Sequence, residues 1–297
     1  MEFHQLRYVC AIAETGSFSR AAERCEIAQP SLSQQVMKLE EDLGAKLFDR
    51  LGRSIRVTEA GRAFLPHARS ILEQMETARS SVADKNTDVR GSVAVGVIPT
   101  IAPYLMPRYT ADFARKYPDA RLRIVEETTP ILVESLRDLS IDLAILALPL
   151  RHKDLESFPI RTEPLFAALP KDHPRAAAES IPLKSLRGER FVMLRDGHCF
   201  RDLSIVTCTH ARITPNIAFE SDQFSSVLGM VAAGVGISLV PEMAVDRDAG
   251  CRYVRLSDTR ASRTIVAAVL RGRSFNRVQR AFLSGIQKGA AKRVMPM

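Results

Sequence analysis

The sequence lacks any apolar run long enough to cross a membrane, and its N-terminus has neither the basic segment nor the cleavage site of a secretory signal. It also has no tryptophan, and only 15 glycines and 16 prolines occur among 297 residues, which argues against fibrous and disordered classes. The 46% hydrophobic and 26% charged residues are typical of a folded chain with room for two or three domains. We therefore expect a cytoplasmic protein whose five cysteines are normally reduced.

Several motifs of enzymes and metal proteins are absent. No CxxC pair or Cys/His spacing suggests zinc, and neither a glycine-rich phosphate loop nor a serine nucleophile elbow occurs. The GVGIS segment around Ile237 is interpreted as a buried strand after a helix. The sequence thus predicts no metal and no cofactor, and it favours a protein that is not an enzyme.

The net charge of +8 suggests a polyanionic partner, but its distribution weakens that argument. Residues 1–90 hold 13 Lys and Arg and 13 Asp and Glu, so this segment is neutral. The excess, 29 basic against 21 acidic residues, lies after residue 90. Evidence for nucleic-acid binding must therefore come from local pattern.

The first 43 residues show the pattern of a helix-turn-helix. Residues 3–13 and a short helix capped by Ser17 each have one apolar face, and Pro30 suits the first turn of a third helix over residues 31–43. The positions expected to face the core are Phe3, Leu6, Val9, Cys10, Ala13, Phe18, Ala21, Ala22, Cys25, Leu32, Val36, Leu39 and Leu43. Short helices joined by a tight turn, the last with small polar donors near its start, predict a recognition helix.

Serine and glutamine near a helix N-terminus can bind base edges or phosphates in the major groove. The side chains of the third helix that we expect to point outward and contact DNA are Ser31, Ser33, Gln34, Gln35 and Lys38. A hairpin follows Gly44, and we interpret it as a wing that lays cations along phosphates or into a narrow minor groove. Its exposed cations are Arg50, Arg53 and Arg56.

A long amphipathic helix is predicted from Thr58 to about Lys85, with Pro66 near its start. Its apolar stripe comprises Phe64, Ile71, Met75, Ala78 and Val82. A lone amphipathic helix of this length needs a partner. The same helix of a second subunit would serve, and the resulting homodimer would bring two recognition helices to two DNA half-sites.

Residues 1–90 resemble the winged helix-turn-helix and linker helix of LysR-type transcriptional regulators over the run AETGSFSRAAERCEIAQPSLSQQVMKLEEDLGAKLFDRLGRSIRVTEAG. The resemblance implies an α/β regulatory half with two subdomains, folded like a periplasmic binding protein. The strand-like segments GSVAVGVI, LRIVEE and IDLAIL, with helices between them, support this independently. We expect a winged helix-turn-helix at 1–58, a linker and dimerisation helix at 59–89, and a regulatory domain at 90–297. Subdomain I would comprise 90–162 and 268–297, and subdomain II 163–267.

The segment LRDGHCFRDLSIVTCT places Cys199 and Cys208 nine positions apart. His198 precedes Cys199 and Arg201 follows it, and a cation or donor beside sulfur stabilises the reactive thiolate. Once oxidised to sulfenic acid, such a cysteine condenses with any thiol within reach. Spacing alone leaves an alternative equally open, in which both are buried apolar cysteines on a loop and a strand.

GHCFRD, followed by a cysteine nine positions after the first, resembles the peroxide-sensing OxyR subfamily of LysR-type regulators. The resemblance implies that Cys199 is the peroxidatic cysteine and Cys208 the resolving one, joined in a reversible disulfide. It implies a peroxide pocket lined by Gly197 and His198, with Thr100, Thr129 and Arg263 at further pocket positions. Leu203 departs from the subfamily, which commonly has glutamine there, so polar support from this position is in doubt.

The resemblance also implies how oxidation would reach DNA. It implies altered subdomain and tetramer packing, activation of antioxidant genes through contact with RNA polymerase at promoter DNA, and reduction by a glutaredoxin or thioredoxin. Two alternatives remain: a LysR-type regulator that binds a small metabolite between the subdomains, and a thiol peroxidase, against which the helix-turn-helix argues. Cys10 and Cys25 are expected in the core, whereas Cys251 is expected to be exposed.

Overall fold

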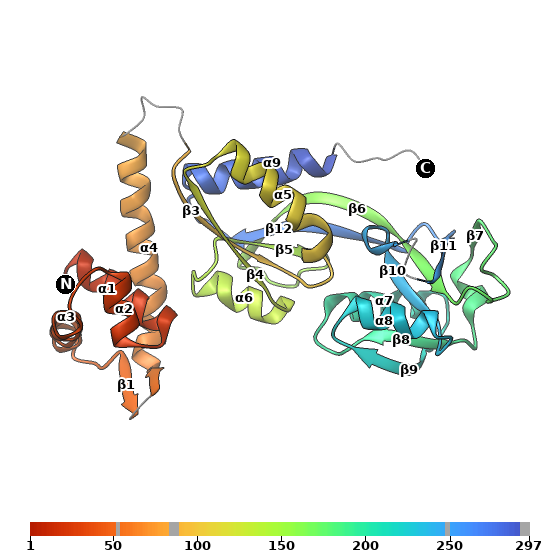
Figure 1. Cartoon of the computed structure of the whole chain (residues 1–297), viewed down its shortest axis with the longest axis horizontal. Helices are drawn as coiled ribbons and strands as arrows, with labels where there is room; N and C mark the ends of the chain where they lie inside the picture. Colours follow the sequence, from red (N-terminus) through yellow and green to blue (C-terminus); the bar gives the residue numbers. More distant parts are fainter. Residues whose placement is uncertain (52–53, 83–88, 247–249, 292–297) are drawn as a thin grey trace.

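The computed structural model describes residues 1–51, 54–82, 89–246 and 250–291, and Figure 1 shows a small helical N-terminal unit, a long helix and an elongated α/β body. In the N-terminal unit three helices surround a core that a two-stranded hairpin completes. Its elements are α1 (Phe3–Thr15), α2 (Phe18–Arg24), α3 (Gln29–Leu43), β1 (Phe48–Leu51) and β2 (Ser54–Val57). This is the predicted winged helix-turn-helix arrangement.

Local sequence explains where these helices begin and end. The Ser17 side chain accepts the Arg20 backbone N–H at the start of α2, and Pro30 occupies the first turn of α3. Gly16 and Gly44 end α1 and α3 in the left-handed conformation, which costs glycine little. The turn between α1 and α2 and both ends of α3 are therefore explained by residues visible in the sequence.

Three side chains of this unit differ from the prediction in whether they are buried or exposed. Phe3 and Leu43 are 55% and 40% exposed because each sits in a terminal turn of its helix, beyond the helices that cover the core. Ser33 is buried, since it shares the inner face of α3 with Leu32 and Val36. The expectation that Ser33 points outward is wrong.

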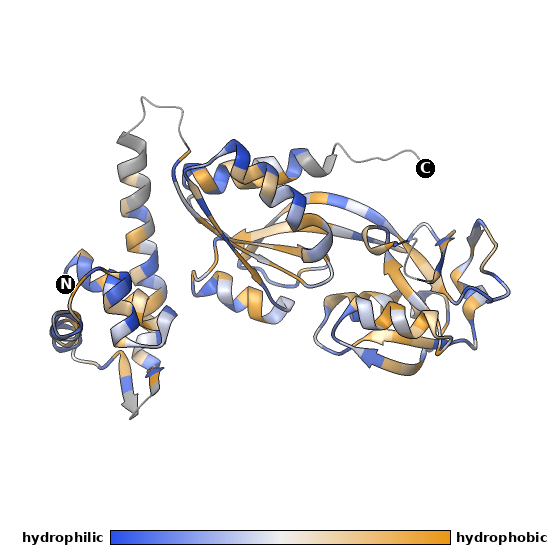
Figure 2. Cartoon of the chain, viewed as in Figure 1, coloured by the Kyte–Doolittle hydropathy of each residue, from blue (hydrophilic) through white to orange (hydrophobic). Residues whose placement is uncertain are grey.

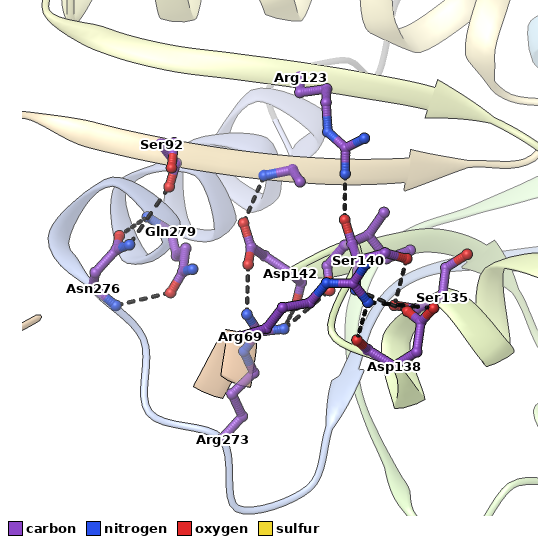
Figure 3. A network of polar contacts seen from close by, with 12 residues as sticks. Arg69, Ser92, Arg123, Ser135, Asp138, Ser140, Asp142, Arg273, Asn276 and Gln279 are labelled. Atoms are coloured by element: carbon purple, nitrogen blue, oxygen red, sulfur yellow. Dashed lines mark hydrogen bonds and ion pairs between the residues drawn. The ribbon is translucent and has the colours of Figure 1, made fainter. Parts of the chain in front are cut away.

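The long helix α4 (Glu59–Val82) packs its first turns against the N-terminal core through Leu65 and Ala68. Beyond them Arg69 reaches the α/β body, where Nη1 donates to the Asp138 carbonyl over 2.6 Å and lies 3.5 Å from its carboxylate (Figure 3). The sequence predicts a helix that ends near Lys85, and that last part falls within 83–88, which lie outside the described residues. The linker helix thus contacts both halves of the chain.

The α/β body is built on an eight-stranded sheet in the order β4-β3-β5-β12-β6-β11-β7, with β10 also paired to β6. A separate parallel pair, β8-β9, lies beside α7 and α8 (Figure 1). The strands are β3 (Gly91–Val97), β4 (Ala120–Glu126), β5 (Leu143–Ala147), β6 (Leu155–Leu169), β7 (Ser180–Ile181), β8 (Arg190–Leu194), β9 (Asn216–Ser221), β10 (Ser238–Pro241), β11 (Arg252–Leu256) and β12 (Ser262–Leu270). The helices are α5 (Ala102–Lys116), α6 (Thr129–Arg137), η1 (Leu183–Leu186), α7 (Cys199–His210), α8 (Phe224–Ala232), η2 (Glu242–Ala244) and α9 (Arg277–Ala291).

Two separate cores divide this body into the two α/β subdomains expected. One core lies among β3, β5, α6 and α9, which we call subdomain I, and the other among β8, α7, α8 and β10, which we call subdomain II. The 15-residue strand β6 serves both, because its first part pairs with β12 and its last part with β10 and β11. Figure 2 shows hydrophobic residues along the strands and hydrophilic ones on outward helix surfaces. Across the described ranges no helix is long and apolar enough to span a membrane.

Candidate functional site

Both cysteines of the predicted switch lie on one helix, α7. Cys199 is its first residue and Cys208 lies near its end, so the alternative that placed them on a loop and a strand is wrong. The buried face of α7 comprises Phe200, Ser204, Thr207 and Cys208, which recur at helical spacing. The side chain of Cys199 lies outside this face and is partly exposed.

The two thiols face different subdomains. Cys208 is 0% exposed within the core of subdomain II, whereas Cys199 packs against the core of subdomain I. Cys208 follows Cys199 by nine positions, so in a helix their Cα atoms lie about 13.5 Å apart along the axis and roughly half a turn apart around it. All five cysteines are free thiols in this structure. A disulfide needs Cα atoms within about 7 Å, so these two cannot bond while α7 is intact.

Cys199 lies at a small pocket between the two subdomains. The pocket is nearly closed: the space among its walls totals about 160 Å³, and almost none of it admits a water-sized molecule. Its lining residues are Ile98, Pro99, Thr100, Thr128, Thr129, His198 and Cys199. The structure therefore brings Cys199 together with three of the predicted pocket residues, Thr100, Thr129 and His198, and adds Ile98, Pro99 and Thr128.

Burial raises the pKa of the Cys199 thiol, and this outweighs the opposing effects of the Thr129 hydroxyl, the Arg263 charge and the N-terminal end of α7. Sequence neighbours led us to expect a stabilised thiolate, and the net direction is the reverse. Thr129 Oγ1 is buried and has no hydrogen-bond partner of ordinary geometry among the described residues. That hydroxyl lies beside the sulfur, so a molecule that enters the pocket would meet both groups.

The two basic side chains adjacent to Cys199 in sequence each lie beside a carboxylate. Arg201 binds the Glu220 carboxylate and donates to the Leu194 carbonyl over 3.0 Å. His198 is buried, and its Nε2 lies 3.5 Å from the Asp222 carboxylate. The charge that lowers the thiol pKa comes instead from Arg263, which is 64 positions away in sequence.

Arg263 lies behind the pocket with no side-chain exposure. Its Nη1 donates to Thr100 Oγ1 over 3.0 Å and its Nη2 to the Thr100 carbonyl over 3.1 Å. Nε donates to Glu163 over 2.7 Å, and the guanidinium lies 5.4 Å from the Phe200 ring. Sequence reasoning missed Glu163. The sequence offered little signal for it, because Glu163 follows the polar residues Arg161 and Thr162 and does not stand in an apolar run.

Two further sequence predictions concern residues around the pocket. Gly197 is not among the lining residues, but it precedes α7 with φ +95°, a conformation that favours glycine, and a Cβ there would meet no atom within 4 Å. Leu203 packs partly buried against the core of subdomain II, away from the lining residues. Its departure from the subfamily pattern therefore leaves the pocket wall unchanged.

The remaining cysteines are structural by their surroundings. Cys10 lies in the N-terminal core, where burial raises the pKa of its thiol to about 11, and Cys25 packs partly buried against the same core. Cys251 was expected to be exposed, but it is buried and its thiol donates to the Leu228 carbonyl over 3.2 Å. Within the described part of the chain, no group of three His, Cys, Asp or Glu could hold a metal ion.

The predicted DNA-binding residues divide into four groups, one of which is the buried Ser33. Ser31, Gln34 and Lys38 are exposed on α3, and Arg56 is exposed on β2. Gln35 is partly buried, because its Oε1 accepts the His4 ring at 3.1 Å and the Gln5 amide at 3.2 Å. Arg50 lies in β1, but its side chain and all of Arg53 lie outside what the structure describes.

Comparisons with known proteins match this architecture along nearly the whole chain. Residues 3–62 match the family described as bacterial regulatory helix-turn-helix protein, lysR family, and residues 86–291 match the LysR substrate binding domain. The DNA-binding transcriptional dual regulator OxyR of Escherichia coli K12 is 34% identical over 82% of this chain and 80% of its own length.

Solved structures agree with these relatives. A full-length cysteine variant of OxyR from Pseudomonas aeruginosa is 32% identical and superposes with a TM-score of 0.84, covering 98% of this chain and 95% of that one. A hydrogen peroxide-bound cysteine mutant of OxyR from Corynebacterium glutamicum is 32% identical, with a TM-score of 0.65 over 98% and 94% of the two chains. The chain belongs to the LysR family of transcriptional regulators and is of the OxyR type within it.

Proposed function

We propose that this regulator senses hydrogen peroxide through Cys199 and converts the signal into a Cys199–Cys208 disulfide. The observation that carries the proposal is the pocket itself, in which a single thiol faces several hydroxyls in a nearly closed space between the subdomains. The related Corynebacterium glutamicum protein has been solved with hydrogen peroxide bound.

The chemistry requires an ionised sulfur and donors for the oxygen atoms. The Cys199 thiolate attacks one oxygen of the peroxide, the O–O bond breaks, and the departing hydroxide takes a proton to become water. Thr129 is placed to hold the peroxide, and Arg263 stabilises negative charge from behind Thr100. The Cys208 thiol then attacks the sulfenic sulfur, which forms the disulfide and releases a second water.

Because burial raises the pKa of Cys199, most of this thiol is protonated at neutral pH. The proposed reaction therefore predicts an oxidation rate that increases with pH through the neutral range, in proportion to the thiolate fraction. Stopped-flow measurement of Cys199 oxidation in the Cys208→Ser variant tests this dependence. A rate independent of pH across that range would contradict the assignment of the thiolate as nucleophile.

The second step requires α7 to unwind, because the helix holds the two cysteines on opposite faces and about 13.5 Å apart. Unwinding removes Phe200 and Cys208 from the core of subdomain II and changes the surface that α7 presents. We propose that this change alters the packing of a homotetramer, respaces its DNA-binding pairs and activates antioxidant genes through RNA polymerase. A dithiol protein of the glutaredoxin or thioredoxin class would reverse the switch.

The remaining parts of the chain have matching roles in this proposal. Residues 1–58 bind promoter DNA, 59–89 form the dimerisation helix, and 90–297 form the redox-sensing domain, within the cytoplasm. Subdomain I comprises 90–162 with 268–297, and subdomain II comprises 163–267. The DNA contacts we propose are made by exposed α3 residues and by the arginines of the β1–β2 hairpin.

Intact mass and thiol counting before and after one equivalent of hydrogen peroxide test the switch. The wild-type chain should lose two of its five thiols within one molecule, whereas the Cys208→Ser variant should stop at sulfenic acid on Cys199. The Cys199→Ser variant should not react, and it serves as the matched control. A wild-type Cys199 that stays reduced would remove peroxide as the effector and leave a metabolite-responsive regulator.

A further inference from the structure

Glu163 occupies an unusual position for an acid. It lies on β6 where the chain crosses from subdomain I to subdomain II, directly opposite Arg263 on β12, and neither side chain has any exposure. An ionised carboxylate is expensive to bury unless both of its oxygens are bound. Here Oε1 accepts Arg263 Nε over 2.7 Å, and Oε2 accepts the Met243 backbone N–H over 2.8 Å.

These contacts belong to a chain of hydrogen bonds that ends at a residue of the pocket. Glu163 fixes the Nε edge of Arg263, which directs both terminal nitrogens to Thr100. Because Thr100 Oγ1 accepts from Arg263, its own hydroxyl proton is left to donate, and Thr100 lines the pocket beside Cys199. A carboxylate outside the pocket thus determines which way a pocket hydroxyl donates.

We propose that Glu163 is a positioning residue of the redox site, which orients Thr100 as a donor through Arg263 and limits the positive charge that reaches Cys199. The first effect rests on the proposed peroxide chemistry, and the second rests on the position of Arg263 between Glu163 and the pocket and on its charge. Glu163 does not contact the pocket, so it acts only through Arg263 and Thr100.

The charges that face the site define what removal of Glu163 should do. The pKa of Cys199 is affected by Arg263 on β12, by Asp202 on its own helix and by the Thr129 hydroxyl on α6. The residue before it, His198, lies beside the Asp222 carboxylate. Arg263 in turn faces Tyr104 of α5. Glu163→Gln removes one negative charge and keeps the shape, so Arg263 loses its counter-charge and stabilises the Cys199 thiolate more strongly.

Two opposite changes are therefore expected in Glu163→Gln. The pH midpoint for Cys199 reactivity, followed with iodoacetamide and peptide mass spectrometry, should shift downward because the thiolate is favoured. The peroxide rate at high pH, where the thiolate is fully formed, should fall by about tenfold because Thr100 no longer donates in a fixed direction. Glu163→Asp keeps the charge but shortens the reach, so it should lower the plateau rate without lowering the midpoint.

Asp142 provides a matched control. Its carboxylate also binds one arginine, Arg273 at 2.5 Å, and one backbone N–H, that of Ala94 at 2.6 Å, but it lies in subdomain I outside the pocket (Figure 3). Asp142→Asn should lower thermal stability and leave both the midpoint and the plateau rate unchanged. If Glu163→Gln, like Asp142→Asn, changes neither the midpoint nor the plateau rate, Glu163 is a structural residue only. If Glu163→Gln does not fold, Glu163→Asp decides: a plateau rate equal to that of the wild type would lead to the same conclusion.

The two readouts separate this inference from the proposed function. A wild-type Cys199 that is inert to peroxide would end the peroxide proposal, yet the alkylation midpoint would still report whether Glu163 controls the charge at the thiol. Conversely, suppose that the wild type reacts normally with peroxide but Glu163→Gln leaves the alkylation midpoint and the plateau rate unchanged. That result would overturn the role of Glu163 and leave the proposed function intact.

Discussion

Unwinding of α7 can be measured by changing helix propensity at positions that make no core contacts. Val206 is 49% exposed on α7, between the two cysteines, so alanine and glycine there differ chiefly in helix propensity. Asp202 provides a second exposed position in the first turns. Glycine is about 0.8–1.0 kcal/mol less favourable than alanine in a helix interior. This cost falls on the reduced state alone if the segment is not helical in the disulfide form.

The expected difference follows from that cost. A 1 kcal/mol change is about a fivefold change in an equilibrium constant. The glycine variant at either position should therefore favour the disulfide about fivefold over the alanine variant, which corresponds to a reduction potential about 20 mV lower. Equilibration in glutathione redox buffers, followed by alkylation and intact-mass analysis, measures this constant directly.

Gly229 is the control, because it is exposed on α8 of the same subdomain and a Cβ there would meet no atom within 4 Å. Gly229→Ala should stabilise the subdomain in urea unfolding but leave the redox equilibrium unchanged. Equal redox equilibria for the alanine and glycine variants at both α7 positions would refute the reasoning, since the helix would then remain folded through oxidation.

Three other outcomes are expected. Burial raises the pKa of Cys208 to about 11, so the contribution of this thiol to the stability of the reduced chain is present below about pH 9 and is lost, by about 3 kcal/mol, as pH rises through about 11. Urea unfolding of Cys208→Val should show a smaller alkaline loss. Lys38→Ala should weaken DNA binding similarly on all sequences and reduce the slope of log affinity against log salt by about 0.9, whereas an unchanged slope in salt titrations would exclude a phosphate contact. Gly61→Ala would place a Cβ 2.2 Å from the Leu47 carbonyl oxygen, so it should destabilise the N-terminal unit by about 1–3 kcal/mol in thermal unfolding, unlike the tolerated Gly229→Ala.

Sequence was sufficient where local chemistry determines structure. Pro30, Gly16 and Gly44 place the helix ends of the N-terminal unit, and the apolar runs of β3 and β5 predict buried parallel strands. The pairing of Cys199 with Cys208 as candidates came from one motif, and the structure places both on α7. These features depend on residues close together in the chain.

Sequence was insufficient where distant residues decide the outcome. The segment that became α7 contains Ile205, Val206 and Thr207, β-branched residues that do not favour a helix, and packing on the subdomain II core overrides that preference. The sign of the Cys199 pKa shift is set by burial between two subdomains, which no local pattern reveals. The Glu163–Arg263 pair joins residues 100 positions apart.

The separation of the two cores of the α/β body limits how much of the protein opens during each cycle of oxidation. Helix α7 contributes the buried residues Phe200 and Cys208 to the core of subdomain II, whereas only its partly buried first residue, Cys199, packs against the core of subdomain I. The opening of α7 therefore disturbs subdomain II while the apolar interior of subdomain I stays closed. Amide hydrogen exchange should accordingly accelerate in α7 on oxidation while β3 and β5 remain protected. A protein built in this way can pass through many cycles of oxidation and repair without exposing the buried strands whose association leads to aggregation.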